Sequence, residues 1–171
     1  MSRGRILMVL AALVAAAALC GCNTQGGVQK VSSTPPAPID AADAIRTLCS
    51  HRPVDWDGQP GPDGLMVLVL FFRQGQDLPV TVRGAMEFAL YEGAVSAEQI
   101  ARVAPARTWS FQGAQLRGCL ARTVWGWGYS VRLGWGQTAP KTSSVTLLIK
   151  HVPPDGPTIY AEPLLIPLGP R

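Results

Sequence analysis

Histidine and the familiar catalytic patterns are scarce in this chain of 171 residues. There are 2 histidines, His51 and His151, and neither belongs to a His-x-His or His-Glu-x-x-His arrangement. The sequence also has no Cys-x-x-Cys, no Gly-x-Ser-x-Gly, no Ser-x-x-Lys and no glycine-rich phosphate loop followed by lysine. Such arrangements hold zinc, an activated serine or a phosphate in the enzymes that use them. The sequence therefore predicts a protein that is not an enzyme and has no metal or cofactor.

Charge is also sparse, at 15% of residues against 47% hydrophobic residues, so the chain has enough apolar surface for a folded core. Two of the 15 lysines and arginines, Arg3 and Arg5, fall in the leader described next, and the rest nearly balance the 11 acidic residues. Because nucleic acid is bound through clusters of basic side chains, and none is present, we expect no nucleic-acid partner.

The chain begins like an exported protein. Arg3 and Arg5 precede an uninterrupted apolar run from Ile6 to Leu19. A helix that spans a bilayer needs about 20 apolar residues, so a run of about 14 is too short and is instead typical of the central region of a signal peptide.

The next four residues, Leu19-Cys20-Gly21-Cys22, resemble the lipobox of bacterial lipoproteins, with leucine at −3 and glycine at −1 of the modified cysteine. The alternative frame, ending at Cys20, would put the bulky Leu19 at −1. The resemblance implies that residues 1–21 are removed and that Cys22 becomes a lipid-bearing N-terminus. It also implies palmitate-type chains that hold the protein to the membrane, since two or more chains anchor durably. The competing interpretation is an ordinary cleaved signal peptide with an incidental Cys-x-Cys.

Asn23 follows the cysteine, where aspartate would resemble an inner-membrane retention signal. We therefore expect the outer membrane, with the protein facing the periplasm. Residues 22–42 are polar and carry Pro35, Pro36 and Pro38, which predicts a flexible tether ahead of a folded domain at 43–171.

Most of that domain has the alternation of apolar and polar residues that is typical of half-buried strands. The longest stretch runs from Val80 to Leu90, where every even position except Gly84 is apolar. The pattern recurs at 108–112, 144–150 and 164–168. In the last of these stretches Pro163 and Pro167 share one face, which predicts an edge strand because proline lacks the ladder donor.

Other segments depart from simple alternation. Leu65–Phe72 is apolar throughout, which predicts a strand covered on both faces. Three short helices are expected, at Asp43–Cys49, from the Ser96 capping box to Val103, and across Ala114–Thr123. The whole predicts an all-β fold, a two-sheet antiparallel sandwich with one or two helical crossovers. It resembles the immunoglobulin-like and fibronectin-like domains, without the antibody Cys-Trp-Cys pattern.

The segment Trp125–Trp135 has bulky residues at every odd position, and Gly126, Gly128 and Gly134 on the other face. The phase of its tryptophans with Tyr129 predicts core positions rather than a ligand platform. The glycines leave room for backbone or a ligand to approach closely.

Once the leader is removed, Cys49 and Cys119 are the thiols left besides Cys22. Exported bacterial domains mature in an oxidising compartment, so an even pair predicts a disulfide between Cys49 and Cys119. The alternative is two separate buried thiols.

Asp55, Asp57 and Asp63 lie among glycines in a stretch that superficially resembles a calcium loop. An EF-hand would need glycine at 60 and glutamate at 66, where the chain has Pro60 and Met66, so the match fails. A calcium site of another kind and a plain turn both remain open. Trp56 stands in the same stretch and, if a ligand binds, is the aromatic side chain we expect it to contact.

Three functions compete on this evidence. We expect a non-catalytic, lipid-anchored envelope protein whose sandwich binds or scaffolds other envelope proteins, through strand addition at the last edge or at the glycine-rich face. The alternative is a small-ligand or carbohydrate binder that uses Trp56 with Asp55, Asp57 and Asp63. The third function, an enzyme, has the least support, because the sequence offers no nucleophile with a base and an orienting group.

Overall fold

The computed structural model describes residues 31–50, 52–136 and 138–169. The predicted signal peptide, Cys22 and His51 lie outside the described residues. No helix within the described ranges is long and apolar enough to cross a membrane.

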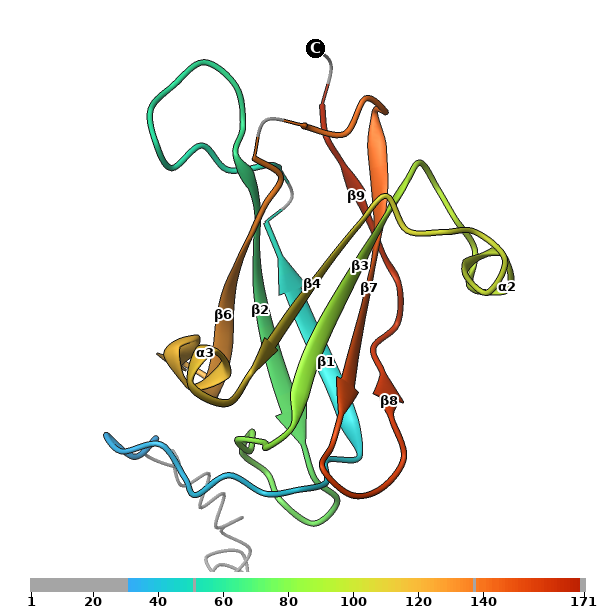
Figure 1. Ribbon diagram of the computed structural model, residues 1–171. Coiled ribbons are helices and arrows are strands. Elements are labelled where there is room, and N and C mark those ends of the chain that lie inside the picture. Colours follow the sequence, from blue (N-terminus) through green and yellow to red (C-terminus); the bar gives the residue numbers. More distant parts are fainter. Residues whose placement is uncertain (1–30, 51, 137, 170–171) are drawn as a thin grey trace, which may run out of the picture. The chain divides into compact units, whose positions relative to one another are not determined.

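Two antiparallel sheets make up the domain, as Figure 1 shows. The first sheet has the order β1-β2-β6-β5, with β1 at Ala44–Cys49, β2 at Gly64–Phe72, β6 at Gly126–Gly134 and β5 at Leu120–Thr123. The second has the order β4-β3-β7-β8, with β4 at Arg107–Gln112, β3 at Ala85–Glu92, β7 at Ser144–Val152 and β8 at Ile159–Tyr160. β9, at Leu164–Pro167, pairs with β7 next to β8. The predicted all-β sandwich of two packed antiparallel sheets is confirmed.

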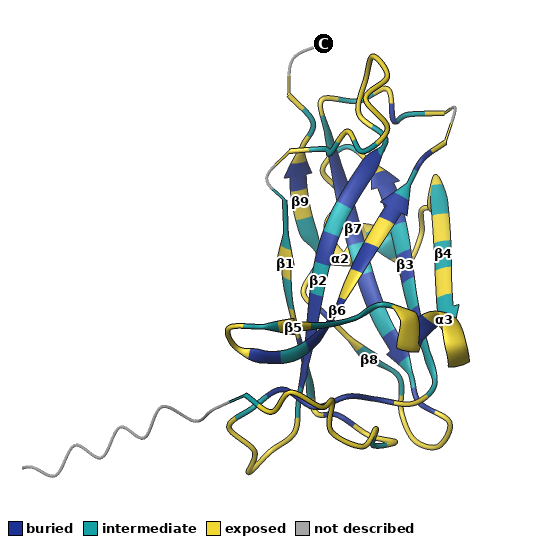
Figure 2. Ribbon diagram, turned by 90° about the vertical axis from the view of Figure 1, so that its left-hand side faces the viewer, coloured by how far each residue is buried: buried dark blue, intermediate teal, exposed yellow. Residues whose placement is uncertain are grey.

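The core lies between the two sheets and follows from the period of two along each strand. Buried and more exposed residues alternate along β2, β3, β6 and β7, as Figure 2 shows by colour. The side chains at the centre of the core come from these four strands, and they include Val67, Phe71, Phe88, Val131 and Leu147. These four strands supply most of the large buried apolar side chains, and burial of apolar surface is the main contribution that stabilises the domain.

β2 departs from its prediction on one face. Leu65, Val67, Val69 and Phe71 are fully buried on the inner face. On the outer face Met66 and Leu68 are only half-buried. The second face of this strand is therefore partly covered within the domain.

The predicted helix at Asp43–Cys49 is wrong, because Ala44–Cys49 forms β1. Its residues pair with β2 in a continuous antiparallel register, from Ala44 opposite Phe72 to Cys49 opposite Val67. Six residues are too few for a stable helix on their own, so pairing with β2 decides the conformation.

The continuous strand predicted from Val80 to Leu90 is interrupted at Gly84, which has φ +100°. A Cβ at this position would clash with the backbone carbonyl of Val152. Val80 and Val82 form isolated bridges to Phe71 and Ile39, and β3 starts only at Ala85. Apolar and polar residues alternate as predicted, but Gly84 ends the pairing before it and β3 begins after it.

Two helices are shorter than expected. The Ser96 capping box is present, with the Ser96 N–H donating to Oε1 of Gln99 at 2.9 Å, and it opens α2 at Ala97–Ile100 rather than a helix to Val103. α3 occupies Gly113–Gly118, and the rest of the predicted crossover becomes β5. Only Leu116 of α3 is buried, so the helix covers one end of the core.

Part of the predicted tether belongs to the sandwich. The Ile39 N–H donates to the Thr81 carbonyl at 2.9 Å, and the Arg83 N–H donates to the Ile39 carbonyl at 2.8 Å. Ala42 is buried, and the Asp40 carboxylate pairs with Arg83 at 3.1 Å. Within the described range, the folded domain therefore starts several residues before the predicted boundary at residue 43.

Candidate functional site

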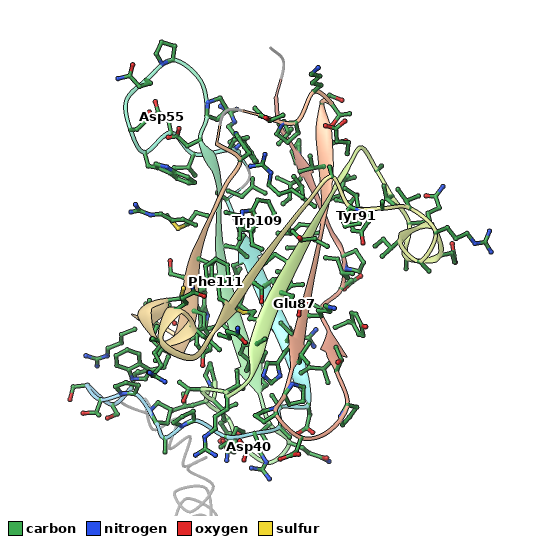
Figure 3. All side chains as sticks on the ribbon, viewed as in Figure 1. Asp40, Asp55, Glu87, Tyr91, Trp109 and Phe111 are labelled. Atoms are coloured by element: carbon green, nitrogen blue, oxygen red, sulfur yellow. The ribbon has the colours of Figure 1, made fainter. Side chains whose placement is uncertain are left out.

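The structure brings together the three aspartates that the sequence singled out. Asp55, Asp57 and Asp63 each place a carboxylate oxygen within 4.8 Å of the others, and Figure 3 shows Asp55 in the loop ahead of β2. These oxygens already accept backbone hydrogen bonds inside the loop. Oδ2 of Asp63 accepts the N–H of Trp56 at 2.7 Å, and Oδ1 of Asp55 accepts the N–H of Gly58 at 2.8 Å. The bonds of Asp55 to the N–H groups that follow it are those of an Asx turn, and Asp63 closes the loop from the other side.

Trp56 is half-buried and packs against the sheet. Its ring lies against Gly64 and Gly134, where a Cβ at Gly64 would come within 2.5 Å of the ring. The guanidinium of Arg132 lies over the same ring, 5.9 Å from its centroid. The side chain expected to contact a ligand therefore uses much of its surface to hold the acidic loop against β2 and β6.

The glycine-rich face of β6 is filled by the protein's own side chains. A Cβ at Gly128 would come within 2.5 Å of Leu70, and a Cβ at Gly126 within 2.7 Å of Pro79. Gly134 faces Trp56, as described above. Glycine is needed here for close packing inside the domain, and the expected opening for a ligand or a partner backbone is absent from this face.

The tryptophans do not share one environment. Trp135 is fully buried, and its Nε1–H donates to the Pro62 carbonyl at 2.7 Å. Trp109 is half-buried and donates to the Gly134 carbonyl at 3.2 Å. Trp125, however, is 52% exposed, so the prediction that the tryptophans of this segment point into the core is wrong for Trp125. Trp125 lies in the turn before β6, where the alternation of the strand no longer sets the direction of the side chain.

The predicted disulfide between Cys49 and Cys119 does not form in the structure, where both thiols are free. The Ser130 N–H donates to the Cys119 carbonyl, Ser130 lies opposite Leu68, and Leu68 lies opposite Leu48. Three strand spacings thus separate the two cysteines, about 14 Å in all. Cα atoms joined by a disulfide are usually under about 7 Å apart. An even number of thiols predicted a disulfide, but it carries no information on the distance between the two cysteines.

Mass spectrometry of the mature protein is expected to find two free thiols without reductant. Alkylation under denaturing, non-reducing conditions should label both Cys49 and Cys119, since the structure holds them at opposite edges of the first sheet. Burial raises the pKa of both thiols, so we expect slow labelling in the folded protein. A species 2 Da lighter, with no alkylation until reductant is added, would show that the arrangement of β1 and β5 is wrong.

His151 is fully buried, and its Nε2 lies 2.6 Å from the Arg83 carbonyl oxygen. A carbonyl only accepts, so Nε2 carries the hydrogen. Burial lowers the pKa of His151, which keeps the ring neutral. Its Nδ1 has no hydrogen-bond partner among the described residues. With Phe71 stacked edge-on at 5.0 Å, this histidine ties β7 to the Gly84 turn and has the surroundings of a structural side chain.

The described residues form several concave regions that the sequence does not predict, among them an end cavity and a groove at one edge. An end cavity of about 520 Å³ lies where residues 35–38 meet residues 81–84, α3 and Tyr129. The sequence gives no sign of this cavity, because a polar stretch with Pro35, Pro36 and Pro38 predicts a free tether. The second region, called the edge groove below, has about 260 Å³ and lies between residues 47–50 and residues 164–167.

The edge groove separates two strands that are each paired on one side only. β1 pairs with β2 alone, and β9 pairs with β7 alone, among the described strands. Figure 2 shows β1 and β9 side by side along one margin of the sandwich. Leu48 from β1 is 46% exposed and Leu165 from β9 is 60% exposed. The groove therefore combines unpaired strand edges with exposed apolar side chains.

Comparisons with protein-family models, with curated proteins and with solved structures each find no significant match.

Proposed function

We propose that this chain is a lipid-anchored, non-catalytic protein of the bacterial cell envelope whose sandwich binds an extended segment of another envelope protein. The single observation that carries the proposal is the leader, in which Leu19-Cys20-Gly21-Cys22 follows a short apolar run. Lipidation at Cys22 would place the domain at the outer membrane, facing the periplasm.

The edge groove supports protein binding as the role of the domain. A strand with an unpaired edge is a template for a further strand, and alternate side chains of that strand would enter the groove. The last edge is the less suitable of the two, because Pro163 and Pro167 remove N–H donors beside and within β9. β1 has no proline between Ala44 and Cys49, so we assign strand addition to β1, with β9 forming the opposite wall.

A binding site for carbohydrate at Trp56 has less support. The ring is packed on Gly64 and Gly134 beside Arg132, which leaves less of it for stacking on a sugar. An enzymatic role also has little support, because His151 contacts a carbonyl and an aromatic ring instead of a nucleophile.

Site-specific crosslinking tests the proposal. We replace Leu165 of the full chain with a photoreactive phenylalanine and express the variant in the native host. Irradiation of its membranes is expected to give a discrete protein adduct. Leu48→Arg should lower the yield of that adduct about tenfold, which corresponds to about 1.4 kcal/mol of lost affinity. Both positions are exposed, so neither change should disturb the core.

Val103 provides the matched control, since it is apolar and 47% exposed but lies outside the groove. A photoreactive residue there should give no adduct of the same mass, and Val103→Arg should leave the adduct at position 165 unchanged. Equal crosslinking at positions 103 and 165 would rule out the edge groove as the binding surface.

A further inference from the structure

The turn between β5 and β6 carries the most exposed large apolar side chain of the described residues. Val124 is 84% exposed, and its neighbour Trp125 is 52% exposed. The turn is rigid, because the Thr123 hydroxyl donates to the Gly126 carbonyl at 2.8 Å and accepts the Trp125 N–H at 3.1 Å. We call Val124 and Trp125 the hairpin tip. The fold thus leaves most of Val124 and about half of Trp125 in solvent.

The residues on either side of the tip hold the start of the described chain. The Arg122 guanidinium donates to the Val31 carbonyl at 2.6 Å, and Nε1–H of Trp127 donates to the Ser32 carbonyl at 3.0 Å. In Figure 1 this first segment, in blue, runs along the end of the sandwich near α3. The hairpin tip is therefore next to the point where the chain enters the domain.

Chain length then limits the distance from the tip to the lipid. Eight residues separate Cys22 from Val31, and the nine residue-to-residue steps between the two span at most about 30 Å whatever path they take. If Cys22 carries acyl chains in the bilayer, this end of the sandwich must lie close to the membrane surface.

The chemistry of the tip fits the boundary between headgroups and acyl chains. Tryptophan is enriched at that boundary because its ring is apolar and its N–H is polar. Arg122 stands directly before the turn, where a cation can meet lipid phosphates. A protein partner would explain the exposed side chains equally well, but not their place beside the chain that leads to Cys22.

We propose that Val124 and Trp125 insert into the interfacial region of the membrane that holds the lipid anchor, and that they orient the domain on it. The inference rests on the proposed lipidation of Cys22. The domain would then have two attachments to the bilayer, the acyl chains and the hairpin tip, which would leave the edge groove in a fixed orientation.

Quenching of tryptophan fluorescence by brominated lipids tests the insertion. The lipidated full-length protein is placed in protein-free vesicles of phosphatidylethanolamine and phosphatidylglycerol with brominated acyl chains. Emission should fall by roughly the share of one of the 5 tryptophans. Trp125→Tyr should abolish most of the decrease, because tyrosine keeps the amphipathic ring but adds no tryptophan emission. Val124→Asp should reduce the decrease by making insertion of the tip unfavourable.

Trp56→Tyr is the matched control. Trp56 packs on Gly134, and the tip adjoins Gly126, so the two lie at opposite ends of β6. We expect the absolute decrease in tryptophan emission of this variant to equal that of the wild type. Vesicle-bound protein without quenching, or quenching that persists in Trp125→Tyr, would overturn the insertion and leave the anchor intact. Protein that carries no lipid and does not sediment with vesicles would instead overturn the anchor.

Discussion

Cys22→Ser is expected to abolish labelling of the protein by an alkynyl palmitate analogue. Serine has no thiol and cannot form the thioether that would carry the diacylglyceryl group. Two or three acyl chains bind a bilayer durably, whereas a polar N-terminus has no such affinity. Labelling of wild type and variant in a bacterial host, followed by gel fluorescence and intact mass, measures the effect, which should be close to complete.

Cys20→Ser is the matched control, because it lies two residues away and falls in the removed leader if the frame is correct. This variant should be labelled and should have the mass of the wild-type mature protein. Loss of label from Cys20→Ser with retention in Cys22→Ser would move the modified residue to Cys20. Equal labelling of all three proteins would contradict the lipobox altogether.

Sequence reasoning succeeded where a strand has one face in the core. β4 alternates in burial as its residues predict, and so does β7 from Leu147 on, since a period of two leaves only one way to turn Trp109 and Phe111 toward the core. It failed at β1, where Ala44, Ile45 and Leu48 fit a short helix as well as a strand. Only the register with β2 distinguishes the two conformations, and β2 begins 14 residues after β1 ends.

The candidate site was harder to predict because it depends on segments that are distant in sequence. The sequence grouped Asp55, Asp57 and Asp63 correctly, but it gave no sign that Trp56 would cover Gly134. The edge groove joins β1 to β9, which are more than 100 residues apart, and no local pattern connects them. The cysteine pairing failed for the same reason.

Docking of residues 36–42 on the sandwich also shortens the connection between the proposed lipid anchor and the folded domain. A free tether from 22 to 42 would extend up to about 70 Å and hold the domain clear of the headgroups. The bonds of Ile39 to Thr81 and Arg83, together with that of Val31 to Arg122, hold the described chain to the domain from Val31 onward, and only eight residues lie between Val31 and Cys22. A short connection restricts the movement of the domain relative to the membrane. An exposed hairpin tip at this end of the domain can therefore stay close enough to the bilayer to contribute to binding.

Tyr129→Phe is expected to destabilise the fold by about 2–4 kcal/mol, because the Tyr129 hydroxyl holds Val82, which lies between the two residues that bond Ile39. The Tyr129 hydroxyl accepts the Val82 N–H at 2.8 Å and donates to the Val82 carbonyl at 3.2 Å. Tyr129 and Val82 are both buried, so phenylalanine would leave the Val82 N–H and carbonyl without their side-chain partner. Urea unfolding of the mature protein in detergent, followed by tryptophan fluorescence, measures the loss of unfolding free energy.

Hydrogen exchange distinguishes this mechanism from a general loosening of the core. In Tyr129→Phe the amides of Ile39 and Arg83, which bond across the docked segment, should exchange faster than those at the centre of β7. Tyr160→Phe is the matched control, because Tyr160 is 59% exposed and its hydroxyl is free to bond water, and we expect a change below about 0.5 kcal/mol. An equally small change for Tyr129→Phe would show that the hydroxyl does not hold Val82. The N-terminal segment would then be held by bonds that do not involve Tyr129, among them those of Ile39 to Thr81 and Arg83.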